Sequence, residues 1–266
     1  MDSEKNKYKL GITLSGGGAK GFAHLGVLQA LNDRGLYPEI ISGTSAGAFA
    51  GVLYADGNSP HEIVSFFKET TFNKFAQFSI PKGGVFKSTP FHSFLDKKLK
   101  AKTFEELKLP LYVTATNIEN GEVEYFNSGS LIPPVIASCS VPLVFTPVEI
   151  NKKYYVDGGL IKKFPVSVLR PKCEKIIGVN VSPLVESKYK NSINYVAERT
   201  FHYMSNVNML QDRQLCNYLI ESEVLCKYRL FDLKNIEEIF QKGYEITQKY
   251  LEKHKKEFHK DFAEFI

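Results

Sequence analysis

The chain has 266 residues, of which 43% are hydrophobic and 24% charged, a balance that excludes disordered and fibrous proteins. Its formal charge of +5 is too small for a dedicated nucleic-acid-binding protein, and no apolar run reaches the roughly 18 residues that a membrane-spanning helix needs. The polar start predicts no signal peptide, and the four scattered cysteines (Cys139, Cys173, Cys216 and Cys226) predict reduced thiols in a cytoplasmic protein.

Short apolar runs alternate with helical patterns along the chain. The expected strands cover residues 8–14, 39–42, 111–117, 122–126, 154–157 and 175–181, and the expected helices cover 19–34, 45–54, 91–99 and most of 191–266. Ser59 and Glu62 form a capping box that opens one more helix, and Asn120-Gly121 predicts a hairpin. Alternating strands and helices predict an α/β fold, and the absence of repeats and linkers predicts a single domain over residues 1–266.

Residues 59–108 are predicted to form a helical cap rich in phenylalanine and lysine. Between Lys68 and Lys108 there are nine lysines and four acidic residues, an excess equal to that of the whole chain, and nine of the 20 phenylalanines lie in residues 66–104. One interpretation places the rings in the core and the lysines in solvent. The other is an interfacial surface, with rings entering acyl chains and lysines meeting anionic headgroups.

The first segment that carries chemistry is Gly16-Gly-Gly-Ala-Lys-Gly21, which satisfies the G-x-G-x-x-G pattern of dinucleotide-binding proteins. That interpretation also requires an acid at the end of the second strand, but Glu39 opens the strand instead. A P-loop is excluded because Phe22 stands where lysine is required. The remaining inference is that bare backbone N–H groups point at an anion, either a phosphate or a transient oxyanion.

The second segment, Gly43-Thr-Ser45-Ala-Gly47, fits the G-x-S-x-G pattern of a nucleophile elbow between a strand and a helix. In a parallel sheet this turn and the glycine loop lie at the same edge, so one supplies a nucleophile and the other N–H donors. The alternative is that both turns serve only the tight packing of small residues. A third turn, Asp157-Gly158-Gly159, follows another apolar run.

Together these segments resemble the patatin-like phospholipase family. The similar segments are residues 10–21 (its oxyanion loop), 24–27, 43–47 (its nucleophile elbow), 137–145, and 157–159 (the motif with its second catalytic residue). The likeness covers about residues 8–182, and the C-terminal helical region, residues 191–266, matches nothing in it.

The resemblance implies a Ser45–Asp157 dyad without histidine, on a three-layer sandwich of helices around a mostly parallel sheet. It also implies an oxyanion hole at Gly16, Gly17 and Gly18. The other motif positions are Gly21, Gly43, Gly47, Gly158 and Gly159. Two departures stand out, because Lys20 replaces a common arginine and Lys162-Lys163 lie where asparagines are common.

The predicted function is hydrolysis of lipid acyl esters, as by a phospholipase A or a lysophospholipase. Burial would raise the pKa of Asp157 enough for it to act as the base of Ser45. No metal or cofactor is expected. The expected partners are a phospholipid or other acyl-ester substrate and, transiently, an anionic membrane surface, which makes the protein cytoplasmic and peripheral. The oligomeric state is left open.

Three alternatives remain from the sequence. Ser45, Asp157 and His202 occur in the chain order of an α/β-hydrolase triad. A lipid-binding regulatory module without catalysis is the second alternative. The third is transacylation, in which an alcohol replaces water.

Overall fold

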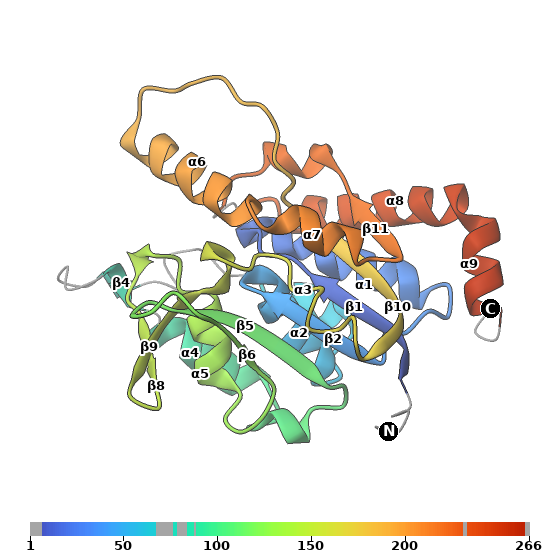
Figure 1. Ribbon diagram of the computed structural model, residues 1–266, viewed down its shortest axis with the longest axis horizontal. Helices are drawn as coiled ribbons and strands as arrows, with labels where there is room; N and C mark the ends of the chain where they lie inside the picture. Colours follow the sequence, from blue (N-terminus) through green and yellow to red (C-terminus); the bar gives the residue numbers. More distant parts are fainter. Residues whose placement is uncertain (1–6, 68–76, 79–83, 88, 231–232, 264–266) are drawn as a thin grey trace.

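The computed structural model in Figure 1 describes residues 7–67, 77–78, 84–87, 89–230 and 233–263. Within these ranges eight strands form a central, mostly parallel sheet. In spatial order they are β11 (Tyr218–Glu221), β10 (Cys173–Asn180), β1 (Tyr8–Leu14), β2 (Ile40–Thr44), β5 (Leu111–Asn117), β9 (Lys153–Asp157) and β8 (Val148–Ile150), with β6 (Val123–Phe126) paired to β5. A smaller sheet contains β3 (Gln77–Phe78), β4 (Gly84–Lys87) and β7 (Leu143–Phe145). The predicted α/β class is confirmed.

Helices connect most of the strands. They are α1 (Phe22–Asn32), α2 (Ala46–Ala55), α3 (Pro60–Ser65), α4 (Thr89–Lys98), α5 (Ile132–Ser138), α6 (Ile193–Asn206), α7 (Met209–Gln214), α8 (Ile236–Lys253) and α9 (Lys255–Phe262), with short 3₁₀ turns η1 (Gly18–Gly21), η3 (Phe104–Glu106), η4 (Gly158–Leu160) and η5 (Glu223–Lys227). The predicted capping box is confirmed, because the Ser59 hydroxyl accepts from the Glu62 N–H and the Glu62 carboxylate accepts from the Ser59 N–H.

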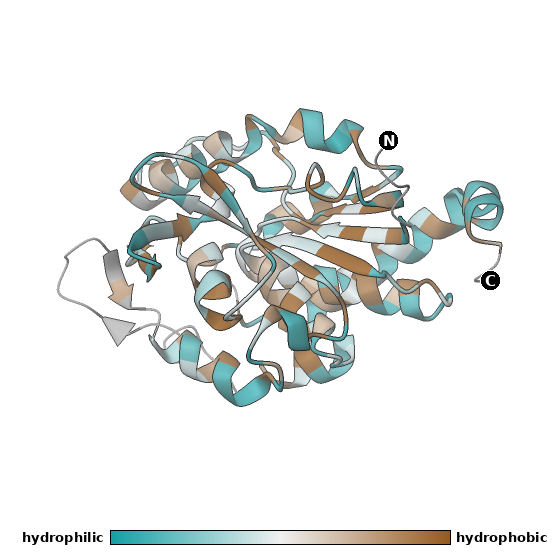
Figure 2. Ribbon diagram, turned by 60° about the horizontal axis from the view of Figure 1, so that its bottom comes forward, coloured by the Kyte–Doolittle hydropathy of each residue, from teal (hydrophilic) through white to brown (hydrophobic). Residues whose placement is uncertain are grey.

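The two faces of the sheet are covered differently. Helices α1, α2, α5 and α8 pack on one face, which receives alternate side chains of β1 such as Ile12 and Leu14. The other face is covered by the connection of residues 161–172 and by α7, through Phe164 and Met209. Figure 2 shows the result, with white and brown strands in the centre and teal residues on the outer turns of the helices.

Strand register brings three turns to one place. Strands β1 and β2 run parallel, with Leu14 opposite Gly43, so the turns that follow them begin at neighbouring positions. Strand β9 runs antiparallel to β5. On β5, Thr114 faces Thr44 of β2, and the next residue faces Asp157 of β9. Asp157 therefore lies level with Ser45, the residue that follows Thr44.

Helix α8 lies directly against α1, which carries the glycine loop at its N-terminus. A Cβ atom at Gly26 would lie 2.0 Å from the Phe240 carbonyl oxygen, and one at Gly243 would lie 2.2 Å from the Ala23 carbonyl oxygen. Only glycine permits this approach of the two backbones, so the glycines fix where the C-terminal helix docks.

The C-terminal region differs from its prediction, because it contains strand β11 and is not helical throughout. The short run Tyr218-Leu-Ile-Glu221 alternates buried and half-buried side chains at the edge of the sheet. Its four residues, set between helical patterns, are too few to show a strand period clearly.

The cap of residues 59–108 also differs, because it contains β3 and β4 beside its helices. Its phenylalanines favour the core interpretation. Phe67 and Phe104 are buried, and Phe66, Phe91 and Phe94 are half-buried against the core. Phe72 and Phe75, and the side chain of Phe78, lie outside the described residues. The interfacial interpretation of this segment stays a prediction.

Within the described ranges, no helix combines the length and the apolar character needed to span a bilayer.

Candidate active site

Ser45 lies on a strained turn between β2 and α2. Its backbone has φ 54° and ψ −122°, a conformation that residues other than glycine rarely adopt. The turn is tight, since a Cβ at Gly47 would lie only 2.1 Å from the Leu14 carbonyl oxygen. The Ser45 hydroxyl makes no capping bond to α2. The backbone of Ser45 is therefore strained although its side chain does not cap α2. This combination is typical of a nucleophile elbow.

The glycine loop lies beside this turn. The Gly16 N–H donates to the Lys163 carbonyl at 3.0 Å, and the Ala19 N–H donates to the Leu230 carbonyl at 2.7 Å. Between them, the N–H groups of Gly17 and Gly18 donate to no acceptor in the described part of the chain. Of the three expected oxyanion-hole residues, Gly17 and Gly18 thus have N–H groups available to a ligand.

Asp157 ends β9 and is 1% exposed. One carboxylate oxygen accepts from the Gly159 N–H at 2.7 Å. Burial raises the pKa of Asp157 to about 7, although hydrogen bonds from the Ser45 side chain and the Gly159 N–H, and the charge of Lys163, act in the opposite direction. The carboxyl thus lies near the Ser45 side chain, and a pKa of about 7 suits a general base at neutral pH.

The three turns are hydrogen-bonded to one another through the segment that follows Asp157. The Thr44 hydroxyl donates to the Lys162 carbonyl at 2.9 Å, and the next carbonyl, of Lys163, accepts from the Gly16 N–H. On the other side, the Ser138 hydroxyl accepts from the Ser45 N–H at 2.8 Å and donates to the Thr114 carbonyl at 2.6 Å. A displacement of one turn would therefore disturb the others.

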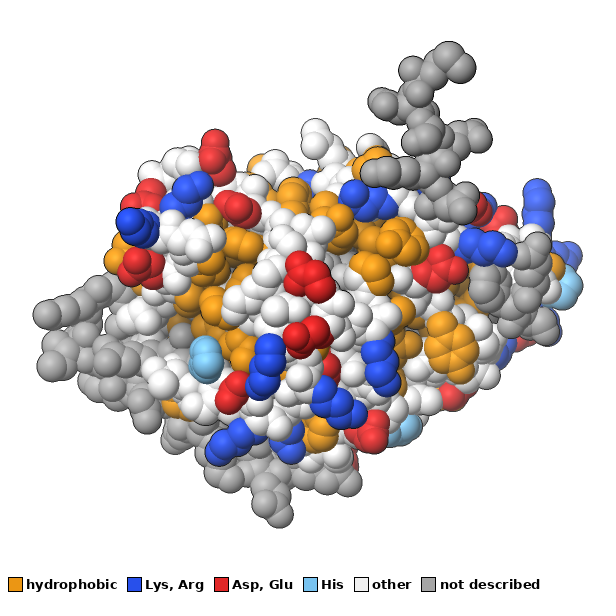
Figure 3. All heavy atoms as spheres, turned by 90° about the horizontal axis from the view of Figure 1, so that it is seen from below, with side chains coloured by type: hydrophobic (Ala, Val, Ile, Leu, Met, Phe, Trp, Pro, Cys, Tyr) orange, Lys and Arg blue, Asp and Glu red, His pale blue; other side chains and the backbone are white. Residues whose placement is uncertain are grey.

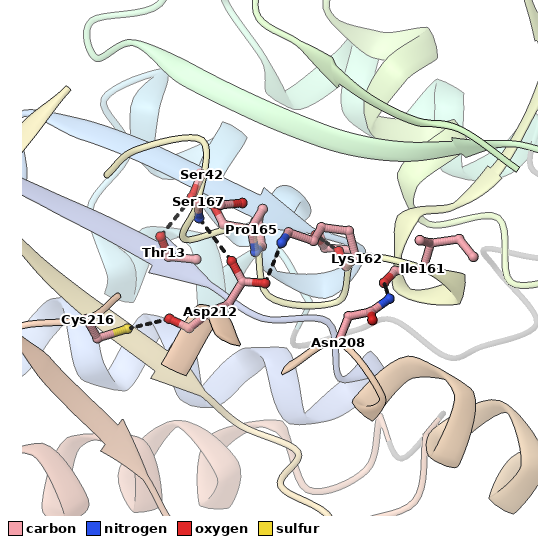
Figure 4. Close-up of polar contacts among 10 residues, drawn as sticks. Thr13, Ser42, Ile161, Lys162, Pro165, Ser167, Asn208, Asp212 and Cys216 are labelled. Carbon is pink, nitrogen blue, oxygen red and sulfur yellow. Dashed lines mark hydrogen bonds and ion pairs between the residues drawn. The ribbon is translucent and has the colours of Figure 1, made fainter. Parts of the chain in front are cut away.

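Helix α7 holds the same segment from outside (Figure 4). The Asp212 carboxylate, 1% exposed, forms an ion pair with Lys162 at 2.5 Å and accepts from the Ser167 N–H at 3.0 Å. Nearby, the Asn208 amide donates to the Ile161 carbonyl at 3.3 Å. The C-terminal region thus anchors the chain between Asp157 and β10.

A cavity of about 1880 Å³ opens above the turns and is lined by Ser45, Asp157 and the glycine loop. One wall is apolar and contains Leu25, Phe49, Ile63, Phe67, Phe86, Phe91 and Ile136. The rings of Phe49 and Phe91 stack at 4.7 Å between centroids, which keeps this wall continuous. Part of the predicted cap therefore lines the space next to Ser45.

Two buried lysines line the polar side of the cavity. Lys163 donates to the Ser182 carbonyl at 2.6 Å, and Lys20 donates to the Tyr228 carbonyl at 3.4 Å. Burial lowers the pKa of both amines, that of Lys163 to about 7 with a further contribution from the charge of Lys20. Neither amine has an ion-pair partner among the described residues. The departures thus place the buried amine of Lys163 near Asp157 and that of Lys20 near Lys163.

Neither histidine considered from the sequence contacts the Asp157 carboxylate. His24 Nε2 lies 2.8 Å from the Ser15 carbonyl oxygen, and His202 Nε2 lies 3.2 Å from the Ser182 carbonyl oxygen. Burial lowers the pKa of each imidazole to about 4, so both are neutral at pH 7. The geometry favours positioning roles for both side chains. It does not form a Ser-Asp-His relay.

The sequence alone does not identify two residues of this hydrogen-bond network, Ser138 and Asp212. Ser138 lies in the stretch 137–145 that supported the resemblance, but nothing in the pattern indicated its bonds to the nucleophile turn. Asp212 lies in the C-terminal region, which has no resemblance to the family. A single acidic residue in a helical pattern there does not indicate a functional position. In the described residues, no three His, Cys, Asp or Glu side chains lie close enough together to hold a metal ion.

Comparison with known families and proteins places these features in context. The family model described as patatin-like phospholipase matches residues 12–170. Lysophospholipase NTE1 of Candida glabrata is 30% identical over 195 residues, which are 70% of this chain and 11% of that protein. Patatin-like phospholipase domain-containing protein 7 of Rattus norvegicus is 31% identical over 176 residues, 63% of this chain and 13% of that protein.

An uncharacterized NTE family protein of Mycobacterium tuberculosis is 29% identical over 162 residues, 60% of this chain and 45% of that protein. The chain therefore spans about a tenth of the length of the fungal and mammalian relatives and less than half of the bacterial one. Among solved structures, VipD from Legionella pneumophila superposes on 94% of this chain and 67% of its own, with a TM-score of 0.62 and 16% identity, which indicates a shared fold.

Proposed function

This chain belongs to the patatin-like phospholipase family, and we propose that it hydrolyses lipid acyl esters with Ser45 as nucleophile and Asp157 as base. The observation that carries the proposal is that a serine on a strained turn lines the same cavity as a buried carboxyl whose pKa is raised to about 7. The names of the relatives, which include lysophospholipases, support the same reaction class.

The reaction follows from this arrangement. Ser45 Oγ attacks the ester carbonyl carbon while Asp157 takes the hydroxyl proton. The carbonyl oxygen becomes an oxyanion that accepts from the N–H groups of Gly17 and Gly18, each worth about 3 kcal/mol. The tetrahedral intermediate then expels the alcohol, which receives the proton from Asp157. Water repeats the sequence on the acyl-enzyme, with Asp157 again as base, and releases the fatty acid.

The substrate side of the proposal rests on the cavity. Its volume of about 1880 Å³ exceeds the roughly 300–1,000 Å³ of sites for small ligands. The apolar wall that contains Phe49, Phe67 and Phe91 suits an acyl chain. We therefore infer that the substrate is a phospholipid or lysophospholipid, and that the protein meets it by transient contact with an anionic membrane.

A fluorophosphonate probe followed by mapping of the labelled peptide tests the reaction class. We expect one adduct, at Ser45, that disappears in Ser45→Ala and becomes much slower to form in Asp157→Asn. Ser187→Ala, at the rim of the same cavity, serves as the matched control and should label normally. An adduct elsewhere, or unchanged labelling without Asp157, would refute the dyad. Release of fatty acid from lysophospholipid, with and without added glycerol, separates hydrolysis from transacylation.

A further inference from the structure

Helix α6 presents an apolar face to solvent beside the candidate active site. Its large hydrophobic side chains recur every three to seven residues along one side and continue just beyond the helix. Their exposed fractions are 85% for Ile193, 47% for Val196, 50% for Tyr203, 75% for Val207 and 66% for Leu210. We call these five residues the α6 ridge. In a soluble protein such a face of an amphipathic helix normally packs on the core.

Other side chains of α6 contact the rest of the protein. Arg199 donates to the Val185 carbonyl at 3.0 Å, and the half-buried Phe201 lies against η4. His202 lies against Ser182. The helix is thus docked through Arg199, His202 and Phe201, while the ridge stays exposed.

Helix α6 borders the cavity, although none of the five ridge residues is among those that line it. Helix α6 contacts η4, the turn directly after Asp157, and Phe201 reaches Gly159 so closely that a Cβ there would lie 3.8 Å from its ring. Figure 1 shows α6 on the outside of the molecule, above the central sheet. Met204 on the same helix lines the cavity and is 47% exposed, so a surface that covered the ridge would lie beside the cavity.

The charge at the rim of the cavity is positive. The exposed basic side chains that line the cavity are Lys190, Lys227, Arg229 and Lys234, against the exposed acids Glu186 and Glu198. On the face turned away from α6, drawn in Figure 3, acidic and basic side chains are instead mixed among hydrophobic ones. A basic cavity rim next to a helix with exposed apolar side chains complements an anionic lipid surface, where lysines and arginines add to the attraction.

We propose that the α6 ridge inserts into the headgroup and acyl boundary of an anionic bilayer and places the cavity mouth against the lipid. This inference rests on the proposed lipid substrate, but it assigns membrane contact to α6 rather than to the phenylalanine-rich segment of residues 66–104. The ridge supplies the apolar contact, and the basic rim supplies the preference for anionic lipid.

The test is flotation of the full chain with phosphatidylcholine vesicles with and without phosphatidylglycerol. We expect binding to the anionic vesicles that weakens as NaCl is raised from about 0.1 to about 0.5 M. The double variant Ile193→Ser, Val207→Ser should bind about a hundredfold more weakly, since each lost apolar side chain costs about tenfold. The matched control is Tyr37→Ser, Ile118→Ser, which removes exposed hydrophobic side chains elsewhere (58% and 46% exposed) and should bind normally.

Hydrolysis of a soluble short-chain ester separates this inference from the proposed function. The ridge variant should keep that activity, and Ser45→Ala should lose it while still binding vesicles. Equal vesicle binding by the ridge variant and the wild type would overturn the inference, as would a wild type that does not bind. Conversion of a dimer to a monomer by the ridge substitutions, seen by size-exclusion chromatography, would show that a second copy covers the ridge and would also overturn it.

Discussion

Residues 8–182 and residues 191–266 meet at the candidate site but contribute to it differently. In the first region β1, β2 and β9 each end in a glycine-containing turn, and these turns supply the nucleophile, the base and the N–H donors of the proposed reaction. The second region supplies no reacting group. It packs around the turns through α8 on α1, the ion pair of α7 with Lys162, and α6 at the cavity mouth. Substitutions in the first region should therefore change the chemistry, and those in the second should change stability, positioning or approach.

Within the second region, helices α6 and α8 differ in whether their apolar faces are buried. Both are amphipathic, but α8 buries Ile239, Phe240 and Leu251, whereas α6 leaves its apolar face exposed. Hydrophobic periodicity alone does not separate them. Helix α8 packs closely on α1 at Gly243, whose missing side chain permits the approach. An apolar stripe in the sequence therefore does not by itself show whether its surface is buried.

The largest effect is expected for Asp157→Asn, within the first region. Without a base for Ser45, kcat should fall by about 10³–10⁴. In the wild type, kcat/KM should rise with pH through an apparent pKa near 7, the value that burial gives Asp157. An acid limb near pH 4 would instead indicate that another group, or an unshifted carboxyl, acts as base.

The same variant should be more stable than the wild type at pH 8. The pKa of Asp157 rises from its ordinary 3.8 to about 7 on folding, so the wild type loses stability as pH rises through that window. The variant does not titrate there and should be more stable by about 2–4 kcal/mol at pH 8, with no gain near pH 4. Urea unfolding at the two pH values measures both differences.

Gly243→Ala tests the role of α8. The new Cβ would meet the Ala23 carbonyl at 2.2 Å, so the helices must separate, at a cost of about 2–3 kcal/mol. Urea unfolding should show this loss, whereas kcat of the folded fraction should change little. Gln241→Ala, exposed on the same helix, is the control and should be neutral. A large fall in kcat without loss of stability would contradict the division between the two regions.

Asp212→Asn tests positioning from the second region. Asparagine keeps the acceptor for Ser167 but loses the ion pair with Lys162. We expect kcat to fall about tenfold at nearly constant KM, because the segment that connects the three turns loosens while the substrate wall is unchanged. A purely structural role would lower stability and leave kcat of the folded fraction unchanged.

Lys162→Met completes this test. It leaves the Asp212 carboxylate buried without a cation, whereas Asp212→Asn leaves a lysine that is 18% exposed and can reach water. Lys162→Met should therefore destabilise the fold more than Asp212→Asn does. The double variant should lose less than the sum of the two single losses, because both act on one ion pair.

The sequence predicts the three turns well because each depends on a local signal. Glycines mark the strained turn at Ser45 and the loop at Gly17, and an apolar run precedes each turn, so the sequence predicts the parallel strands and the turns that follow them. The positions of Asp212 and Ser138 depend on which segments pack together in three dimensions. Short patterns such as β11 and the half-buried phenylalanines of the cap are likewise decided by tertiary packing, which the sequence pattern does not specify.

The smallest effect is expected for His202→Ala, which lies where the two regions meet. His202 lines the cavity and follows Ser45 and Asp157 in the chain order of a triad, but its Nε2 lies against Ser182, and burial together with the charge of Lys163 lowers its pKa to about 4. An imidazole that stays neutral and is bonded elsewhere contributes little to the proton transfer from Ser45. We expect kcat on a soluble ester to stay within about twofold of the wild type. A collapse of kcat in a variant that unfolds normally would assign the base to His202 and give the second region a direct part in the chemistry.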